Sequence, residues 1–185
     1  MLVLTLIKRT DVRILEDMKD HYSQPGGFVG RNLCYAILFN DIYFGSIVGG
    51  SATKHLPGRL IQDSLNKGIN NIFFHLRALK YPCRNFTTKI LAAYRKQVEQ
   101  DWKSKYNDIP LWHETLVEPP RTGDCYLRDK WTQVGITKGY TCKRVAGIGT
   151  DSWSGRRVWD TVNLRPKLVF VRQTSIAELA CLKTH

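Results

Sequence analysis

Two short stretches of this sequence carry side chains that could move a proton during a group-transfer reaction. In the first, Trp112-His113-Glu114-Thr115, an imidazole and a carboxylate are neighbours on a predicted strand, and either could take a proton from an attacking amine. Neighbouring residues of a strand point to opposite faces, so at most one of the two faces a cleft. In the second, Tyr126 lies on a predicted short helix that could direct its phenol into a cleft. The alternative is that Tyr126 is a core aromatic residue.

The start of a predicted long helix has the chemistry of a phosphate site. A helix N-terminus offers unpaired N–H groups and the positive end of the helix dipole, so it attracts anions. The polar residues there that could bind the phosphates of a cofactor are Arg84, Asn85, Thr87, Thr88 and Lys89. The alternative for any one of them is an ordinary structural role, since Asn85 and Thr87 are also suitable helix caps.

The composition indicates a globular protein with an unusual charge. The 185 residues are enough for one domain with a sizeable core, and 43% of them are hydrophobic. The formal net charge is +12, and it is uneven, because residues 121–172 hold 11 basic and 4 acidic side chains. A basic excess concentrated in one segment favours a polyanionic partner, whose condensed counterions are released on binding. The alternative is a basic surface that serves only solubility.

The sequence predicts neither a metal site nor a membrane anchor. The five cysteines and the histidines lack the spacing of metal ligands, and we expect the cysteines to be reduced thiols. No stretch is long enough to cross a membrane, and the apolar N-terminus is too short for a signal peptide. We therefore expect a protein of the cytoplasm that has no membrane partner.

The predicted elements that must position these residues alternate between strands and helices. Strands are predicted over residues 2–7, 34–39, 43–48, 71–76, 109–117, 136–142 and 168–172. Helices are predicted over residues 11–22, 86–106 and 124–131, and a loop over 146–160. This order indicates an α/β (α+β) fold with a mixed sheet flanked by helices, in a single domain over residues 1–185.

The segment CYLRDKWTQVG, from Cys125 to Gly135, resembles the LYxKxGFxxVG signature near the end of the GNAT N-acyltransferase fold. The resemblance implies a GNAT-like fold with a mostly antiparallel sheet. It aligns Tyr126 with the tyrosine that protonates the leaving thiolate of coenzyme A. The family binds the pyrophosphate of that cofactor at the helix start that corresponds to residues 84–89. This chain lacks the glycines of the family loop there, and Lys130 replaces the glycine of the signature.

Five further segments resemble one group of proteins, the phage Mom proteins, so that the similarity covers nearly the whole chain. They are RNLCYA (31–36), IVGGSAT (47–53), TKGYTCKRVAG (137–147), GTDSW (149–153) and LRPKLVF (164–170). This resemblance implies an enzyme in the cytoplasm of an infected host bacterium that converts adenine in DNA to N6-carbamoylmethyl adenine and so protects phage DNA from restriction. Ser51 becomes a candidate catalytic residue, because Gly49 and Gly50 beside it let a ligand approach closely.

With this resemblance, the loop at residues 147–157 is the first choice for the active site. Asp151 could accept a hydrogen bond from the exocyclic amine of adenine, while Trp153 stacks on an extruded base. The alternative is a salt-bridged turn. The predicted catalytic residues are thus Asp151, Tyr126, Glu114 and Ser51. The predicted DNA-binding residues are Trp153, Lys138, Lys143, Arg144, Arg156, Arg157, Arg165 and Lys167, whose cations would hold phosphates.

Two acyl donors and three function classes follow from these patterns. The fold resemblance implies acetyl-CoA as the donor. Glycyl-tRNA is the second donor, because a carbamoylmethyl group has the composition of a glycyl residue with its nitrogen. The expected partners are double-stranded or locally unpaired DNA, and tRNA. The other two classes are a non-catalytic DNA-binding anti-restriction protein and an ordinary acetyltransferase that acts on a protein or a small amine.

Overall fold

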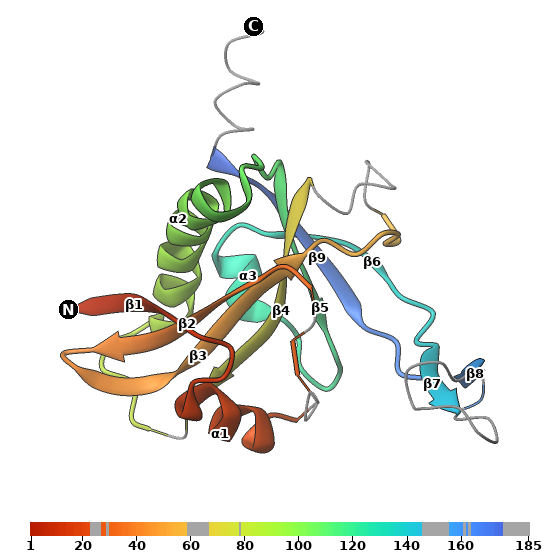
Figure 1. The fold of residues 1–185 in the computed structure, drawn as a ribbon, viewed down its shortest axis with the longest axis horizontal. Helices are drawn as coiled ribbons and strands as arrows, with labels where there is room; N and C mark the ends of the chain where they lie inside the picture. Colours follow the sequence, from red (N-terminus) through yellow and green to blue (C-terminus); the bar gives the residue numbers. More distant parts are fainter. Residues whose placement is uncertain are drawn as a thin grey trace, which may run out of the picture.

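The computed structural model describes residues 1–22, 27–28, 30–58, 67–77, 79–145, 156–160, 162 and 164–175. Within them the chain forms a seven-stranded sheet, a separate two-stranded sheet and three helices (Figure 1). The strands of the large sheet are β1 (Leu2–Ile7), β2 (Asn32–Phe39), β3 (Ile42–Ser51), β4 (Gly68–Leu76), β5 (Trp112–Val117), β6 (Thr132–Ile136) and β9 (Leu168–Gln173). The helices are α1 (Val12–Asp20), α2 (Phe86–Tyr106) and α3 (Asp124–Arg128).

Local sequence explains how the N-terminal elements begin and turn. The side chain of Asp11 accepts a hydrogen bond from the backbone N–H of Arg13 at 3.0 Å and so caps the start of α1. The hairpin between β2 and β3 turns at Asn40 and Asp41, which both adopt positive φ, at 46° and 64°. Two such residues make the turn whose twist matches that of paired strands, and Asn and Asp tolerate it well. The strands predicted over residues 34–39 and 43–48 are therefore confirmed, and they pair as a hairpin.

The large sheet has the strand order β1-β2-β3-β4-β5-β9-β6. All neighbouring strands run antiparallel except β4 and β5, which are parallel and are joined through α2. Parallel strands need a long crossover connection, and α2 supplies it. This topology confirms the predicted mixed, mostly antiparallel sheet flanked by helices.

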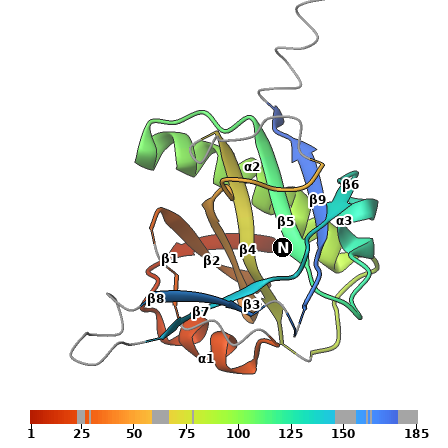
Figure 2. The same ribbon diagram turned by 90° about the vertical axis from the view of Figure 1, so that its right-hand side faces the viewer.

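The sheet is covered on both faces, with α2 and α3 on one face and α1 on the other (Figures 1 and 2). Alternation along β2 shows this directly, because Tyr35 packs in a cluster with α2 whereas Cys34 packs in a cluster with α1. The larger cluster includes Trp102 of α2 and Tyr126 of α3, both buried. The main core therefore lies between the sheet and α2, and α3 belongs to that same layer.

Two predicted elements near the C-terminal third are wrong in extent. The helix predicted over residues 124–131 ends at Arg128, because Lys130 adopts the left-handed conformation with φ 61° and turns the chain into β6. The strand predicted over 136–142 does not exist as one strand. The chain breaks at Gly139, with φ 80°, and β7 (Thr141–Val145) pairs with β8 (Arg156–Asp160) in the small sheet. The predicted loop at 146–160 therefore contains a strand.

Candidate functional site

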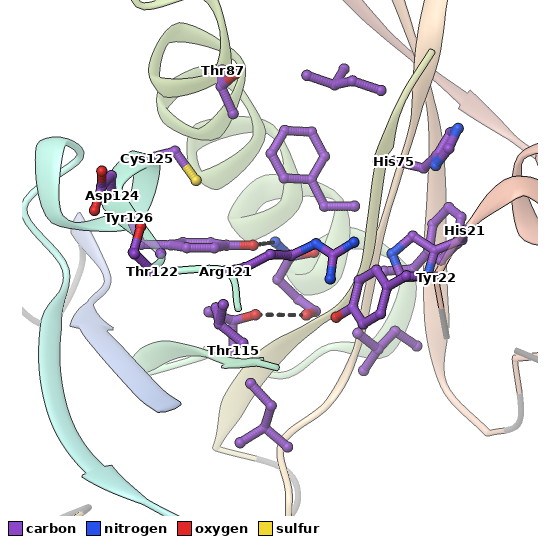
Figure 3. Close-up of a pocket in the computed structure, with 18 of the residues that line it drawn as sticks. His21, Tyr22, His75, Thr87, Thr115, Arg121, Thr122, Asp124, Cys125 and Tyr126 are labelled. Atoms are coloured by element: carbon purple, nitrogen blue, oxygen red, sulfur yellow. Dashed lines mark hydrogen bonds between the residues drawn. The ribbon is translucent and has the colours of Figure 1, made fainter. Parts of the chain in front are cut away.

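A cavity lies where strands β4 and β5 stop pairing with each other. The two strands pair from Gly68 and Trp112 as far as Asn71 and Thr115, and both continue beyond that point without pairing to each other. The register of β4 against β3 also shifts here, which makes Ile72 the extra residue of a β-bulge. A cavity of about 630 Å³ lies at this divergence, lined also by the end of α1, the start of α2 and residues 121–126 (Figure 3).

Tyr126 projects from α3 to the cavity wall (Figure 3). Helix α3 starts at Gly123, whose φ of 77° and lack of a side chain are both needed, since a Cβ there would lie 2.5 Å from the ring of Phe170. The Tyr126 ring then stacks on Phe170 and meets Trp131 edge to face, with centroid distances of 5.7 and 5.1 Å. Burial raises the pKa of Tyr126 above its ordinary value of 10.0, so the phenol keeps its proton.

Asn71 on β4 is bonded to two of its neighbours across the cavity wall. Its side-chain Nδ2 donates to the hydroxyl oxygen of Tyr126 at 3.0 Å. Its backbone carbonyl oxygen accepts a hydrogen bond from Oγ1 of Thr115 at 3.1 Å. Figure 3 marks both bonds with dashed lines. Asn71 is only 5% exposed, and its Oδ1 has no hydrogen-bond partner among the residues that the structure describes. The bond to Asn71 holds the Tyr126 hydroxyl at the point where the strands separate.

The opposite end of the cavity reaches the N-terminus of α2. Asn85 caps this helix in the left-handed conformation, with φ 57°, so it makes the turn that a glycine would otherwise favour. No acidic residue lies in the first helical turn. Thr87 lines the cavity (Figure 3), whereas Arg84, Asn85, Thr88 and Lys89 do not, and Nζ of Lys89 lies 3.5 Å from Sγ of Cys83. The structure therefore brings one of the five predicted phosphate-binding side chains to the cavity, next to a helix N-terminus that suits an anion.

A third wall of the cavity, at the end of α1, carries basic and aromatic side chains (Figure 3). The guanidinium of Arg121 lies 3.7 Å from the ring centroid of Tyr22, and the rings of His21 and His75 are 6.0 Å apart. Burial, together with the nearby His75 and Arg121, lowers the pKa of His21 to about 4. His21 is therefore neutral at pH 7, since both burial and the positive charge of Arg121 disfavour its protonation.

The other two predicted catalytic residues of the described chain lie away from this cavity. Glu114 is fully buried on β5, where its carboxylate accepts hydrogen bonds from the backbone N–H of Thr53 and, at 2.9 Å, from Nε1 of Trp112. Ser51 ends β3 opposite Ile69 and does not line the cavity. Of the predicted catalytic residues, the structure thus places only Tyr126 on the cavity wall, and Asp151 lies outside the described residues.

The predicted DNA-binding residues form two groups. The first group is Lys138, Arg165 and Lys167, which lie on two backbone segments that are hydrogen-bonded to each other. The N–H of Thr137 donates to the Lys167 carbonyl, and the N–H of Arg165 donates to the Gly139 carbonyl, both at 2.9 Å. The second group lies on the small sheet, where β7 carries Lys143 and Arg144. On β8, Arg157 is directly opposite Arg144, and Arg156 is opposite Val145. Trp153 lies outside the described residues.

Among the described residues, no group of three or more His, Cys, Asp and Glu side chains could hold a metal ion. None of the helices found in the described ranges has the length and apolar character to cross a membrane.

Sequence reasoning missed Asn71, His21, Tyr22 and Arg121 as parts of the site. A signal for Asn71 was present in the sequence, since β4 reads GINNIFFHL and places two adjacent amide side chains between apolar residues. A buried polar residue in such a strand needs a bonding partner and therefore indicates a site. The other three residues are brought together by the contact between the end of α1 and the segment before α3, which no local pattern reveals.

Comparisons with known proteins define the fold. No protein-family model and no curated protein matches this sequence. An aminoglycoside acetyltransferase in complex with coenzyme A and kanamycin matches with a TM-score of 0.61 and 13% identity, over 97% of this chain and 98% of its own. An acetyltransferase from Bacillus subtilis in complex with CoA has a TM-score of 0.58 and 9% identity, over 94% and 99% of the two chains. A GNAT family acetyltransferase from Elizabethkingia anophelis with acetyl-CoA bound has a TM-score of 0.51 and 11% identity, over 93% and 97%. The chain therefore has the fold of the GNAT acetyltransferases.

Proposed function

We propose that this chain is an acyltransferase that modifies the exocyclic amine of adenine in DNA. The observation that carries the transfer chemistry is the Tyr126 hydroxyl, which is buried on the cavity wall between the diverging strands β4 and β5. A phenol with a raised pKa keeps its proton at neutral pH, and it can deliver that proton to a leaving thiolate or alkoxide. Tyr126 is the proposed general acid of the reaction.

The residues along the cavity fit an activated acyl donor that carries phosphate groups. The donor supplies an acyl carbon on a good leaving group. The N-terminus of α2, with Thr87 beside it and no acidic residue in its first turn, would bind the phosphates. Asn85 supplies the left-handed turn there, so the lack of the family's glycines does not prevent a phosphate site. The coenzyme A complexes of the structurally similar acetyltransferases support an acyl thioester as one donor.

Composition of the product supports a second donor, a glycyl ester of tRNA. An acetyl group supplies no nitrogen, whereas a carbamoylmethyl group contains an amide nitrogen. If the adenine amine attacks a glycyl ester, the new glycyl amine can attack the ring carbon that bears the amide. Expulsion of that amide nitrogen leaves adenine–NH–CH₂–CO–NH₂, with every atom accounted for. Asp151 is the proposed base for the proton that the adenine amine loses, because the carboxylate of Glu114 is buried away from the cavity.

The charge distribution supports DNA as the acceptor. The protein has a net charge of +12, and the group Lys138, Arg165 and Lys167 is held together by backbone hydrogen bonds beyond β6 and β9. Side chains of Arg165 and Lys167 also lie 4.0 and 3.3 Å from the carboxylate of Glu118, so part of their charge is compensated. Adenine is hydrogen-bonded and stacked in a duplex, so the base must be extruded or unpaired to reach the cavity.

Mass spectrometry of nucleosides from the DNA of expressing cells tests the proposal. We expect a modified adenosine with the wild-type protein and its loss with Tyr126→Phe. The matched control is Tyr35→Phe, which removes another buried hydroxyl, bonded to Asp101 at 2.8 Å and outside the cavity, and should retain the modification. In vitro, isotope-labelled glycine on tRNA and labelled acetyl-CoA identify the donor by which label enters the DNA.

The basic segment favours one alternative, a non-catalytic protein that masks DNA from restriction enzymes. DNA from expressing cells would then resist restriction only while the protein is bound, and purified DNA would contain unmodified adenine. Protection that survives removal of the protein excludes this alternative.

A further inference from the structure

The orientation of the Asn71 amide leaves one buried polar atom without a partner. Its Nδ2 is used by the hydroxyl oxygen of Tyr126, at 3.0 Å, and the amide plane is thereby fixed. Oδ1 lies at the other corner of the same amide and accepts no hydrogen bond from any residue that the structure describes. Leaving a buried carbonyl oxygen without a hydrogen bond costs free energy of folding, and Asn71 is only 5% exposed, so Oδ1 is a site at which a donor group is expected.

The groups around Asn71 in the described part of the chain do not supply that donor. The Thr115 hydroxyl donates to the backbone carbonyl of Asn71 rather than to its side chain. The hydroxyl of Tyr94, which lies close to Gly49 of β3, also lacks a partner within the described chain and gives no bond to Oδ1. Asn71 does line the cavity, so a ligand that enters the cavity can reach it.

We propose that Oδ1 of Asn71 binds one N–H of the acceptor's primary amine and so selects acceptors that carry an exocyclic amino group. This inference rests on the proposed acyl transfer and names the residue that recognises its acceptor. A primary amine has two N–H bonds, of which the reaction removes one. Asn71 holds the other, which directs the nitrogen lone pair at the acyl carbon.

The position of Asn71 beside Tyr126 assigns its oxygen to the acceptor rather than to the donor. Tyr126 protonates the leaving atom, and that atom is bonded to the acyl carbon that the amine attacks. The attacking nitrogen must approach that carbon to about 3–3.5 Å, so it lies in the immediate neighbourhood of Tyr126. In a coenzyme A thioester the nearest amide N–H is separated from sulfur by two methylene groups. In a glycyl ester the free amine and the leaving oxygen are on opposite sides of the carbonyl carbon. The reacting amine is therefore the N–H group that fits beside the Asn71–Tyr126 pair.

A binding experiment tests this inference without turnover. The probes are two single-stranded thymine oligodeoxynucleotides, one with a central adenine and one with a central purine, which is adenine without its amino group. We expect the wild-type protein to bind the adenine probe about tenfold more tightly by fluorescence anisotropy, the value of one well-made hydrogen bond. Asn71→Leu should bind both probes equally.

The matched control is Asn70→Leu, which removes a buried amide from the neighbouring position of β4. Asn70 is 7% exposed, donates to Oγ1 of Thr53 at 3.0 Å and does not line the cavity, so this variant should keep the preference for adenine. A wild-type protein that binds both probes equally overturns the inference, and so does an Asn71→Leu variant that keeps the preference.

A second variant keeps the test decisive if Asn71→Leu does not fold. Asn71→Asp retains an acceptor for the amine but replaces the donor to Tyr126 by a carboxylate, which accepts a hydrogen bond from the phenol and so holds its proton away from the leaving group. We expect this variant to prefer the adenine probe and to lose at least about tenfold in kcat with little change in acceptor KM. Loss of the adenine preference in Asn71→Asp overturns the inference. Absence of any modified nucleoside, with the wild-type preference for adenine present, refutes the acyl transfer and leaves the binding role of Asn71 standing.

Discussion

Arg95 of α2 and Asp129 at the end of α3 form an ion pair with two hydrogen bonds inside the protein. Nε and Nη2 of Arg95 lie 2.7 and 3.0 Å from the two carboxylate oxygens, and the side chains are 11% and 5% exposed. The same carboxylate accepts from Nε1 of Trp131 at 2.8 Å, and Arg172 donates to the Asp129 carbonyl. These bonds fix α3, and with it Tyr126, against α2.

Loss of this pair should destabilise the protein far more than loss of an exposed pair. We expect Arg95→Leu to lower the free energy of unfolding by about 3 kcal/mol, because it leaves a buried carboxylate with only part of its compensation. The control is Arg13→Leu, whose partner Asp11 lies 2.8 Å away in a pair that is 37% and 21% exposed, and it should cost less than about 1 kcal/mol. Urea denaturation measures both, and equal costs would contradict the role of the buried pair.

The pH dependence of catalysis should show no titration of Tyr126 in the ordinary range. Burial raises the pKa of Tyr126 above 10.0, and the reaction requires the protonated phenol, so kcat should not fall on the alkaline side below pH 10 on account of this group. Tyr126→Phe should lower kcat by about 100-fold or more, uniformly across that range. An alkaline fall near pH 8 in the wild-type kcat profile that disappears in Tyr126→Phe would refute the assignment.

Stability should fall in mildly acidic solution because of His21. Its pKa is about 4 in the folded protein against an ordinary value of 6.5, so between these values the unfolded chain binds a proton that the folded chain does not. The stabilisation is complete above pH 6.5 and is lost as the pH falls towards 4, by about 3 kcal/mol in total. The neighbours His75, Arg121 and Lys167 lower the pKa of His21 in the same direction as burial does.

His21→Gln removes the titrating group and isolates its effect. Thermal or urea unfolding of both proteins between pH 7 and pH 4 should give a stability difference that changes across this window. If both proteins lose stability in parallel, another group is responsible.

The basic small sheet should contribute to DNA affinity through charge. Arg156 and Arg157 are consecutive on β8, and their joint replacement by Ala should weaken binding to all sequences. The slope of log K against log salt should become less steep by up to about 2 units, about one for each lost phosphate contact. Lys96 and Lys103, which are exposed on α2, give a double-Ala control with the same loss of charge, and an equal change in slope for both pairs would refute a local contact.

The fold could be predicted from the sequence wherever local patterns and burial agree. The bounds of β1 and α2 were predicted as observed, since a branched apolar run and a long amphipathic repeat each indicate one structure. The end of α3 was not predicted, because a lysine at position 130 gives no sign of a left-handed turn. Asp129, the residue before that turn, is held by tertiary contacts with Arg95 and Arg172.

The site could be predicted only in part, for a physical reason. Tyr126 was recognised because its own segment carries a signature, and the helix start at Asn85 because a helix N-terminus is a local feature. Asn71 and Arg121 became part of the site only because β4 and β5 diverge, and that divergence arises from pairing between residues distant in the chain. Local periodicity contains no information about where two parallel strands stop pairing.

The strand order has a consequence for how the protein is made. Strands β1 to β4 are neighbours in sequence order, so this half of the sheet can form from local hairpins as soon as it leaves the ribosome. The other half cannot, because the last strand, β9, lies between β5 and β6. Strand β5 therefore waits for residues up to Gln173 before its outer edge is covered. Every residue that lines the cavity precedes position 127, but Phe170 of β9, on which Tyr126 stacks, is made much later, so the Tyr126 ring gains this support after the rest of the cavity wall.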